Sequence, residues 1–164
     1  MKNKVTVYIA SHNYGKFLQE AIESVLNQTM NSWELFLIND NSSDNTGEIM
    51  SIYLNDPRVR ILNTKGIGLI QIANLIIKKS KSDYIVRLDA DDVFDENALL
   101  VLSNYLDLNK DLAIVFPDYY LIDENGKIFA QDRRQQVFYK NHVFDIPPNG
   151  ATTMIRLKTL KKIG

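Results

Sequence analysis

Cysteine is absent from the 164 residues, so disulfide bonds and thiolate metal sites are excluded. Glycine and proline are few, at 7 and 4 residues, which excludes collagen-like and low-complexity classes. The formal net charge is −1. Because the protein has no overall positive field that would attract polyanions, we expect no nucleic-acid partner.

Long hydrophobic runs are also missing. The amino-terminal apolar segment Val5–Ala10 is interrupted by Thr6 and followed by polar residues, so it is too short for a signal-peptide core or a membrane span. We therefore expect a cytoplasmic protein. With 45% hydrophobic and 24% charged residues, the composition is that of a globular domain with a substantial core.

Strand-like and helix-like spacing alternate along the first 116 residues. Short β-rich runs predict strands at 5–10, 33–38, 59–62, 84–88 and 112–116. Apolar residues at helical spacing predict helices near 17–26, 49–54, 69–77 and 98–108. This order predicts a mainly parallel sheet with helices on both faces, a three-layer α/β/α architecture of Rossmann-like type.

The pattern weakens from Pro117 onward. Residues 119–131 predict a hairpin that turns at Glu124-Asn125-Gly126. Residues 132–150, which include His142, predict a surface loop. Two groups of lysines, at 78–81 and 158–162, are interpreted as solvated helix faces or ends.

Acidic residues follow two of the predicted strands. Asp40 comes directly after the run WELFLIN, and Asp89, Asp91 and Asp92 come directly after YIVRL. In an open parallel sheet, ligands bind at the carboxyl ends of the strands, where the strand order reverses. Carboxylates this close resist joint ionisation unless a cation compensates them. Their hard oxygen atoms suit Mg²⁺ or Mn²⁺, shared with substrate phosphates.

Helix capping is the competing interpretation of these acids. We expect Asp44, Asp92 and Asp95 to cap neighbouring helices. Asp89 and Asp91 precede the predicted helix start, so capping accounts for them poorly.

Two further alternatives to a metal shared with substrate phosphates are a calcium-binding loop and compensation of the acids by the side chain of Arg87. The stretch DNSSDNTG resembles the start of an EF-hand, but Asn45 stands at the glycine position and Ser51 at the bidentate glutamate position, which excludes that loop. Arg87, inside the fourth strand, is expected either to shield the neighbouring acids or to face the sheet edge.

Two stretches closely resemble the amino-terminal half of family 2 inverting glycosyltransferases, which have the glycosyltransferase-A fold. They are VTVYIASHNYGKFLQEAIESVLNQTMNSWELFLINDNSSDNT at 5–46 and SDYIVRLDADDVFDENAL at 82–99. The resemblance covers about the whole chain. It implies one domain of this type at 1–164, with a nucleotide-sugar-binding part at about 1–116 and the start of an acceptor-side part at about 117–164.

The resemblance implies roles for residues on the nucleoside side. Ala10, Ser11 and His12 correspond to residues that line the nucleoside pocket, although His12 is equally interpreted as a polar surface residue. Asp40 corresponds to the aspartate that binds the base edge, as a carboxylate can accept from an imide N–H. A nucleotide-side loop is implied for the residues Lys65, Gly66 and Gly68, followed by Asn74.

The resemblance also implies a metal site. Asp89, Ala90 and Asp91 correspond to the Asp-x-Asp motif, with Asp89 toward the ribose or the metal and Asp91 toward an Mn²⁺ or Mg²⁺ ion that bridges two phosphates. Asn39 stands where many relatives carry a second aspartate. Asn149-Gly150 either corresponds to a loop near the sugar or acceptor, or is an ordinary turn.

Inverting transfer needs a carboxylate that removes the proton of the acceptor hydroxyl. In the family this base lies further along than LKTLKKIG, so we expect it beyond Gly164 and expect the chain to be truncated. Asp118, Asp123 and Asp145 are the carboxylates within the chain that could substitute, and each is a weak candidate.

Two hypotheses follow. The first is a transferase that moves a sugar from a UDP-sugar to a saccharide or lipid-linked acceptor in cell-surface polysaccharide synthesis, with peripheral association at the cytoplasmic membrane face. The second is a catalytically incomplete nucleotide-sugar-binding module. A sugar-phosphate nucleotidyltransferase is disfavoured, because ASHNYGKF contains one glycine where that class has a glycine-rich signature.

Overall fold

A six-stranded sheet in the order β3-β2-β1-β4-β10-β5 forms the centre of the computed structural model, which describes residues 3–132, 138–139, 142–143 and 151–163. Its strands are β1 (Val5–Ser11), β2 (Trp33–Asp40), β3 (Val59–Thr64), β4 (Tyr84–Arg87), β5 (Ile114–Val115) and β10 (Met154–Arg156). The helices are α1 (Gly15–Leu26), α2 (Thr46–Ser51), α3 (Leu69–Lys79), α4 (Ala98–Leu108) and α5 (Leu157–Ile163).

The strand order reverses beside β1. Strands β3, β2, β1 and β4 are all parallel, and β1 pairs with β2 on one side and with β4 on the other. The chain therefore runs outward from β1 to β2 and β3, then returns to start β4 on the opposite side of β1. Such a switch point opens a crevice at the carboxyl ends of the strands.

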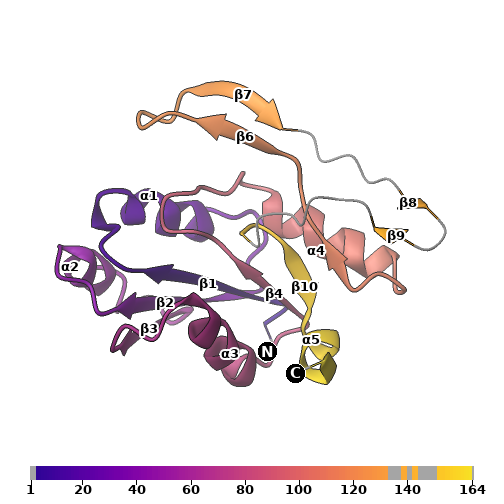
Figure 1. The fold of residues 1–164 in the computed structure, drawn as a ribbon, viewed down its shortest axis with the longest axis horizontal. Coiled ribbons are helices and arrows are strands. Elements are labelled where there is room, and N and C mark those ends of the chain that lie inside the picture. The colour runs from indigo at the N-terminus through magenta and orange to yellow at the C-terminus, as the bar shows by residue number, and fades with distance from the viewer. Residues whose placement is uncertain (1–2, 133–137, 140–141, 144–150, 164) are drawn as a thin grey trace.

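Helices cover both faces of the sheet, which confirms the predicted three-layer α/β/α architecture (Figure 1). Helices α1, α2 and α4 pack over one face, where Leu18, Met50 and Leu102 join the larger hydrophobic core. Helices α3 and α5 pack over the other face through Ile76 and Leu157. Burial on both sides explains why the strands are nearly continuous apolar runs.

Helix α2 is shorter than the sequence predicts. It ends at Ser51, and Ile52 and Leu54, which we assigned to its apolar stripe, are 63% and 65% exposed. Met50 is buried and Tyr53 packs against the core from the turn that follows. A helix of six residues has fewer than two turns, so the apolar residues that follow it are not placed on its buried face.

Strand β10 was not predicted, and helix α5 was anticipated only through its lysines at 158–162, without bounds. Strand β10 lies antiparallel between β4 and β5. Its Arg156 is buried, with Nη2 donating to Leu106 O at 2.9 Å and Nε to Leu112 O at 3.2 Å. Arg156 thus satisfies carbonyl groups at the end of α4 and just beyond it. Strand β10 has only three residues, and these do not alternate between apolar and polar. Such a short pattern does not distinguish a strand from a loop.

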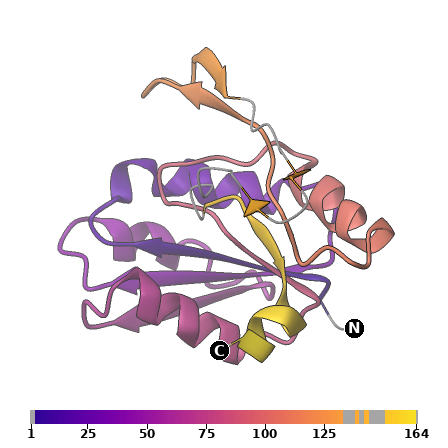
Figure 2. The same cartoon turned by 45° about the vertical axis from the view of Figure 1, so that its right-hand side comes forward.

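The predicted hairpin is confirmed as β6 (Tyr119–Ile122) and β7 (Ile128–Asp132). It stands away from the main sheet in both ribbon views (Figures 1 and 2). Within the predicted loop after it, Phe138–Tyr139 (β8) pairs with His142–Val143 (β9). That part of the loop prediction was wrong, because these residues form a short antiparallel pair of strands. Two-residue strands carry too little pattern to be recognised in the sequence.

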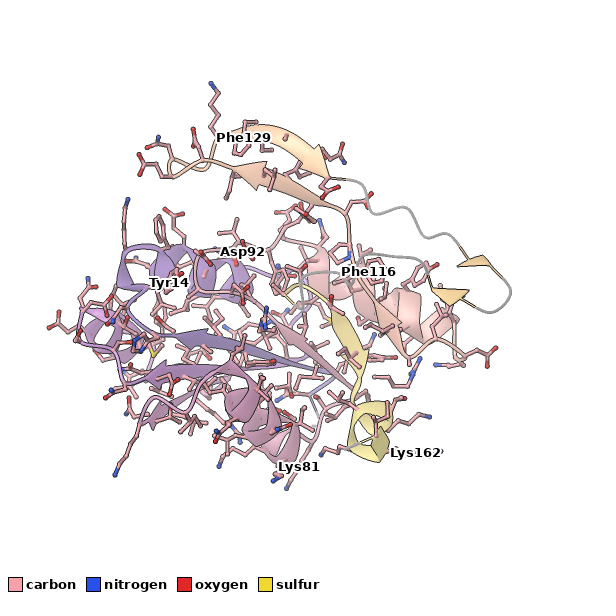
Figure 3. All side chains as sticks on the ribbon, viewed as in Figure 1. Tyr14, Lys81, Asp92, Phe116, Phe129 and Lys162 are labelled. Atoms are coloured by element: carbon pink, nitrogen blue, oxygen red, sulfur yellow. The ribbon has the colours of Figure 1, made fainter. Side chains whose placement is uncertain are left out.

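The two lysine groups lie next to each other. Helices α3 and α5 are in contact, and Lys81 and Lys162 are found at the same lower edge of the molecule (Figure 3). The lysines of both groups are exposed, as expected for solvated helix faces and ends. Within the described ranges, every helix falls short of the length and apolar character that a membrane span requires.

Candidate functional site

A cavity of about 560 Å³ opens at the carboxyl ends of β1, β2 and β4, at the switch point of the sheet. Its lining residues are Ala10, Ser11, His12, Tyr14, Asp40, Gly66, Gly68, Leu69, Ile72, Asp89, Ala90 and Asp91. Four separate loops, remote from one another in the sequence, therefore meet in one place.

Most of the residues predicted for the site line this cavity. Lys65 is the exception among the predicted nucleotide-binding residues: it is exposed on the loop after β3 and does not contribute to the lining. Asn74, on an exposed position of α3, does not line the cavity either.

Asp40 is buried at the end of β2, with 6% of its surface exposed. Its Oδ1 accepts hydrogen bonds from Thr64 Oγ1 at 2.6 Å and from the Ile67 amide at 2.8 Å, and Oδ2 accepts from the Gly68 amide at 2.8 Å. Burial alone would raise the pKa of Asp40, but the hydrogen bonds from Thr64, Gly68 and Ile67 outweigh it and lower the pKa.

The loop held by Asp40 depends on its glycines. Gly66 and Gly68 have φ angles of +72° and +80°, and Gly68 combines this φ with a ψ of 161°. That backbone region is essentially restricted to glycine. The conformation turns two consecutive amides toward the carboxylate, so the loop and Asp40 form one unit.

The loops after β1 and β2 are tied together by polar side chains. Asn13 Oδ1 accepts from the Ser43 amide at 2.7 Å, and Ser42 Oγ accepts from the Asn13 amide at 3.1 Å. Asp44 accepts from the amides of Gly15 and Thr46 at 2.9 and 3.0 Å, at the starts of α1 and α2. The capping predicted for Asp44 is confirmed and extends to α1.

Asn39 also belongs to this network. Its Oδ1 accepts from the Ser42 amide at 2.9 Å. An aspartate oxygen could accept the same hydrogen bond, so asparagine at this position preserves the loop while removing one negative charge from the site.

His12 lies at the mouth of the cavity on the loop after β1. Its Nδ1 is 2.7 Å from the carbonyl oxygen of Asp40. Because a carbonyl only accepts, Nδ1 must carry the proton, which leaves Nε2 of the neutral ring as an acceptor. The ring is therefore oriented by the backbone beside Asp40 rather than free in solvent.

Arg87 compensates part of the charge at the end of β4. Its Nη2 donates to Asp89 Oδ2 at 3.3 Å, and its Nε lies 2.8 Å from Asp89 Oδ1. The Nε contact is an ion pair without the alignment of a hydrogen bond. The shielding role considered for Arg87 is thus confirmed. Burial nevertheless keeps the pKa of Asp89 above its usual range, although Arg87 opposes the shift.

Asp92 is the most perturbed acid of the cluster. Burial, followed by the charges of Asp89 and Asp91, raises its pKa to about 6. Asp92 makes no side-chain hydrogen bond to α4 among the described residues, so the capping predicted for it was wrong. Asp95 Oδ1 accepts from the amide of Asn97 at 2.9 Å, one residue before α4 begins at Ala98. This bond orders the turn before α4 and does not reach an amide of the helix, so the capping predicted for Asp95 was wrong as well.

Asp91 is exposed and lines the cavity. It makes no hydrogen bond or ion pair with the part of the chain that the structure describes. In that same part, no group of three or more histidine, aspartate or glutamate side chains is arranged around a metal position. Because Mg²⁺ and Mn²⁺ bind one or two carboxylates and complete their shells with phosphates and water, Asp91 with Asp89 fits that donor set.

An apolar wall was missed by the sequence interpretation. Leu69 and Ile72, from the first turn of α3, line the cavity, and Tyr14 lines it from the start of α1 with 45% of its surface exposed. The sequence contained a signal for this wall, because Leu69 directly follows Gly68 of the predicted nucleotide-side loop and belongs to the predicted apolar stripe of α3. The apolar pattern alone, however, does not distinguish a leucine that lines a cavity from one that is buried in the core.

Two of the three carboxylates considered as the base, Asp118 and Asp123, lie outside the cavity lining. Asp123 Oδ1 accepts from the amides of Asn125 and Lys127 at 2.9 and 3.0 Å, so it forms the hairpin turn. Asp118 is exposed and is not part of the cavity lining. Asp145 and the loop Asn149-Gly150 lie outside the described residues.

A mainly parallel sheet with a carboxylate-bearing cavity at its topological switch point is typical of nucleotide-binding α/β domains of the Rossmann-like class. Comparison with known families is more specific. The family model described as glycosyl transferase family 2 matches residues 6–160, and the chain belongs to this family.

Curated relatives agree with this membership. Glycosyltransferase GlyG of Streptococcus pneumoniae serotype 4 is 37% identical over 132 residues, which cover 79% of this chain and 43% of GlyG. Chondroitin synthase of Pasteurella multocida is 34% identical over 128 residues, covering 77% of this chain and 13% of the synthase. The chain therefore spans less than half the length of these relatives.

Solved structures share the fold. S. aureus TarS 1–349 in complex with UDP-GlcNAc has a TM-score of 0.77 at 20% identity, covering 98% of this chain and 47% of that one. Mannosyltransferase PcManGT from Pyrobaculum calidifontis, solved with GDP-Man and Mn²⁺, has a TM-score of 0.63 at 16% identity and covers 71% of this chain and 35% of that one. The glycosyltransferase-A fold is thereby shown.

Proposed function

We propose that this chain is the donor-binding part of an inverting glycosyltransferase that takes its sugar from a UDP-sugar. The observation that carries the proposal is the cavity at the switch point, where Asp40 on one side and Asp89 and Asp91 on the other line the same space. One end offers an acceptor for a nucleobase and the other offers ligands for a metal-bound diphosphate. The TarS structures with UDP and UDP-GlcNAc support the choice of donor.

The hydrogen bonds of Asp40 favour uracil over guanine. A carboxylate accepts about four hydrogen bonds. Thr64, Ile67 and Gly68 already supply three, and the Gly66 amide adds a further contact that also lowers the pKa of Asp40. At most one position is left. Uracil presents one imide N–H, whereas guanine presents two adjacent N–H groups that would need both oxygens of a carboxylate.

The remaining walls suit a planar ring. Leu69 and Ile72 offer an apolar surface, and Tyr14 and His12 lie at the mouth with exposed rings. A nucleobase placed between them would bury both faces while its polar edge reaches Asp40.

The diphosphate end requires a cation. Asp91, assisted by Asp89, would hold an Mn²⁺ or Mg²⁺ ion, which when bound would neutralise charge on the leaving diphosphate. The PcManGT structure with Mn²⁺ supports this assignment. Arg87 holds Asp89 in a fixed orientation, so one ligand would be preorganised and the exposed Asp91 would adjust to the ion.

Inversion requires a single displacement, in which the acceptor hydroxyl attacks the anomeric carbon opposite the diphosphate and loses its proton to a base. We propose a saccharide or lipid-linked acceptor in cell-surface polysaccharide synthesis, at the cytoplasmic membrane face. The similarity to a chondroitin synthase and a hyaluronan synthase supports a polysaccharide product.

A nucleotide-sugar-binding module without catalysis is the second candidate. The observation that favours it is the cavity lining, in which Asp40, Asp89 and Asp91 are the only carboxylates among the described residues. Each already has a proposed binding role, so none is available as the base. Release of UDP from UDP-sugars in the presence of Mn²⁺ separates the two candidates, because a bare binding module would bind the donor without turnover.

The donor site is tested by calorimetric titration of UDP into the protein with and without Mn²⁺. We expect binding that strengthens with Mn²⁺ and that Asp91→Ala weakens by about 10-fold or more. Asp118→Ala, outside the cavity, is the matched control and should bind as the wild type does. Equal affinity of the Asp91→Ala variant with Mn²⁺ present would contradict the proposed metal site.

A further inference from the structure

Residues at the end of α1 form hydrogen bonds with the segment 94–99, which follows the acidic turn after β4. Gln28, just after α1, is buried, with 4% of its surface exposed. Its Nε2 donates to the carbonyl oxygen of Asp95 at 2.6 Å, and its Oε1 accepts from the Leu99 amide at 2.9 Å. These bonds join residues that lie 67 and 71 positions apart.

Two neighbours of Gln28 reinforce the contact. Ser24 Oγ accepts from the Phe94 amide at 3.1 Å. The Thr29 amide donates to Glu96 O at 2.9 Å, and Thr29 Oγ1 donates to Asn97 Oδ1 at the same distance. Ser24, Gln28 and Thr29, which we name the α1 clamp, therefore hold residues 94–99 at several points.

The acidic turn 89–93 lies between this clamp and the sheet. On the sheet side, the Leu88 amide donates to Tyr8 O at 3.1 Å. Within the turn, the amide of Asp92 donates to Asp89 O at 3.2 Å. Five residues that carry three carboxylates are thus tethered at both ends, while like-charge repulsion among the carboxylates favours opening of the turn.

We propose that the α1 clamp, with Gln28 at its centre, positions the carboxylates of Asp89 and Asp91 for the metal-bound diphosphate. The inference rests on the donor site proposed above and adds residues that do not touch the cavity. Clamping the turn before the ligand arrives lowers the ordering cost of binding. Supporting residues around metal ligands act in this way, and their loss typically weakens metal affinity about 10- to 100-fold.

The chemistry of Gln28 makes the role testable. The position needs a donor toward Asp95 O and an acceptor toward the Leu99 amide at once, and a side-chain amide supplies both. Gln28→Glu keeps the size and the acceptor but replaces the donor by an oxygen that faces a carbonyl. A variant of nearly equal shape should therefore release the Asp95 side of the clamp.

The experiment compares two probes on the same chain, UDP with MnCl₂ and uridine alone. For Gln28→Glu we expect binding of UDP with Mn²⁺ to weaken about 10-fold while uridine affinity is unchanged, because the nucleoside end does not contact the turn. Ser24→Ala removes a single clamp bond and should weaken UDP binding less, again without affecting uridine. It provides the test should Gln28→Glu fold poorly.

Thr6→Val is the matched structural control. Thr6 is buried and bonds Glu34 and Ser82 at the opposite end of β1, so the variant should lose stability without changing either affinity. Amide hydrogen exchange over 89–95 adds a readout that needs no ligand, and we expect faster exchange there in Gln28→Glu than in Thr6→Val.

Failure of the inference and failure of the proposed function look different. If the wild type binds UDP with Mn²⁺ but both clamp variants keep that affinity, or lose uridine affinity in parallel, the positioning role is overturned. If the wild type does not bind UDP with Mn²⁺, the donor site itself is overturned, whatever the exchange rates show.

Discussion

The two acidic strand ends of this site are built in opposite ways. At the end of β2, Asp40 is surrounded by neutral donors from Thr64, Ile67 and Gly68, which lower its pKa. At the end of β4, burial raises the pKa of Asp92 to about 6, and the like charges of Asp89 and Asp91 add to the shift. One carboxylate is thus satisfied by its own chain, and the other is in an environment that disfavours its charge.

This difference indicates which end of the cavity is preorganised in the absence of a ligand. The Asp40 loop is held by the protein alone, so the proposed binding of a nucleoside would need little rearrangement. The β4 end is balanced only in part by Arg87, which pairs with Asp89, and it should gain most from a bound cation. Stability should therefore fall when the first end is altered and change little, or rise, when charge is removed from the second.

Asp40→Ala should have the largest effect. It leaves the amides of Ile67 and Gly68 and the hydroxyl of Thr64 without their acceptor, so we expect a loss of about 3 kcal/mol or more in the free energy of unfolding. Urea denaturation at pH 7.5 measures it. The deficit should shrink as the pH falls from the ordinary pKa of an aspartate through the lowered pKa of Asp40, because protonation removes the same stabilisation from the wild type. A loss under about 1 kcal/mol would show that the loop is held by other contacts.

Gly68→Ala tests the same loop through its backbone. A side chain at φ +80° and ψ 161° is strained, and we expect a loss of about 1–3 kcal/mol by the same denaturation. Gly126→Ala, at φ +77° in the exposed hairpin turn, is the control. It should lower stability without affecting UDP binding, whereas Gly68→Ala should weaken both.

The fold and the general place of the site could be predicted because they follow from local pattern. Periodicity identified the first five strands, and the strand-end rule placed Asp40 and Asp89 at one edge. What holds them could not be predicted in the same way. The bonds of Asp40 depend on the path of the loop after β3, and those of Gln28 join residues about 70 positions apart.

The charge balance at β4 shows the same limit. The crowded acids led us to expect compensation by a metal and left open whether Arg87 shields them or faces the sheet edge. Arg87, two residues from Asp89, supplies part of the compensation. Residues i and i+2 share a face only while the strand continues, and β4 ends at Arg87. Their pairing therefore depends on how the chain turns after the strand, which the sequence pattern does not specify.

Asp92→Asn should raise stability. A folded-state pKa of about 6 against an ordinary value of 3.8 means that the folded state binds the proton more tightly, so the contribution of Asp92 to wild-type stability falls as the pH rises from about 4 to about 6. The variant should lack this fall and gain about 1–2 kcal/mol at pH 7.5. This is less than the unscreened shift implies, because Asp92 is only partly buried.

Thermal denaturation of both proteins between pH 3.5 and 7.5 measures this difference. The two curves should converge below about pH 4, where the unfolded-state carboxyl is also protonated. A variant that is less stable than the wild type at every pH would mean that Asp92 makes a stabilising contact. It would contradict the inference that burial and like charges make the ionised form of Asp92 unfavourable.

Asp91→Asn should have the smallest effect on stability and therefore sharpens the comparison most. Its side chain is exposed and has no partner in the described residues, so we expect a change within about 0.5 kcal/mol, in the direction of a slight gain because one like charge beside Asp89 and Asp92 is removed. With Mn²⁺ and UDP present, however, the wild type should gain thermal stability by ligand linkage and the variant should gain much less. A residue whose loss is neutral to the free protein but costly to the ligated one is a ligand-binding residue. Equal thermal shifts in the two proteins would place the cation elsewhere and leave the Asp40 end as the only part of the cavity with a defined partner.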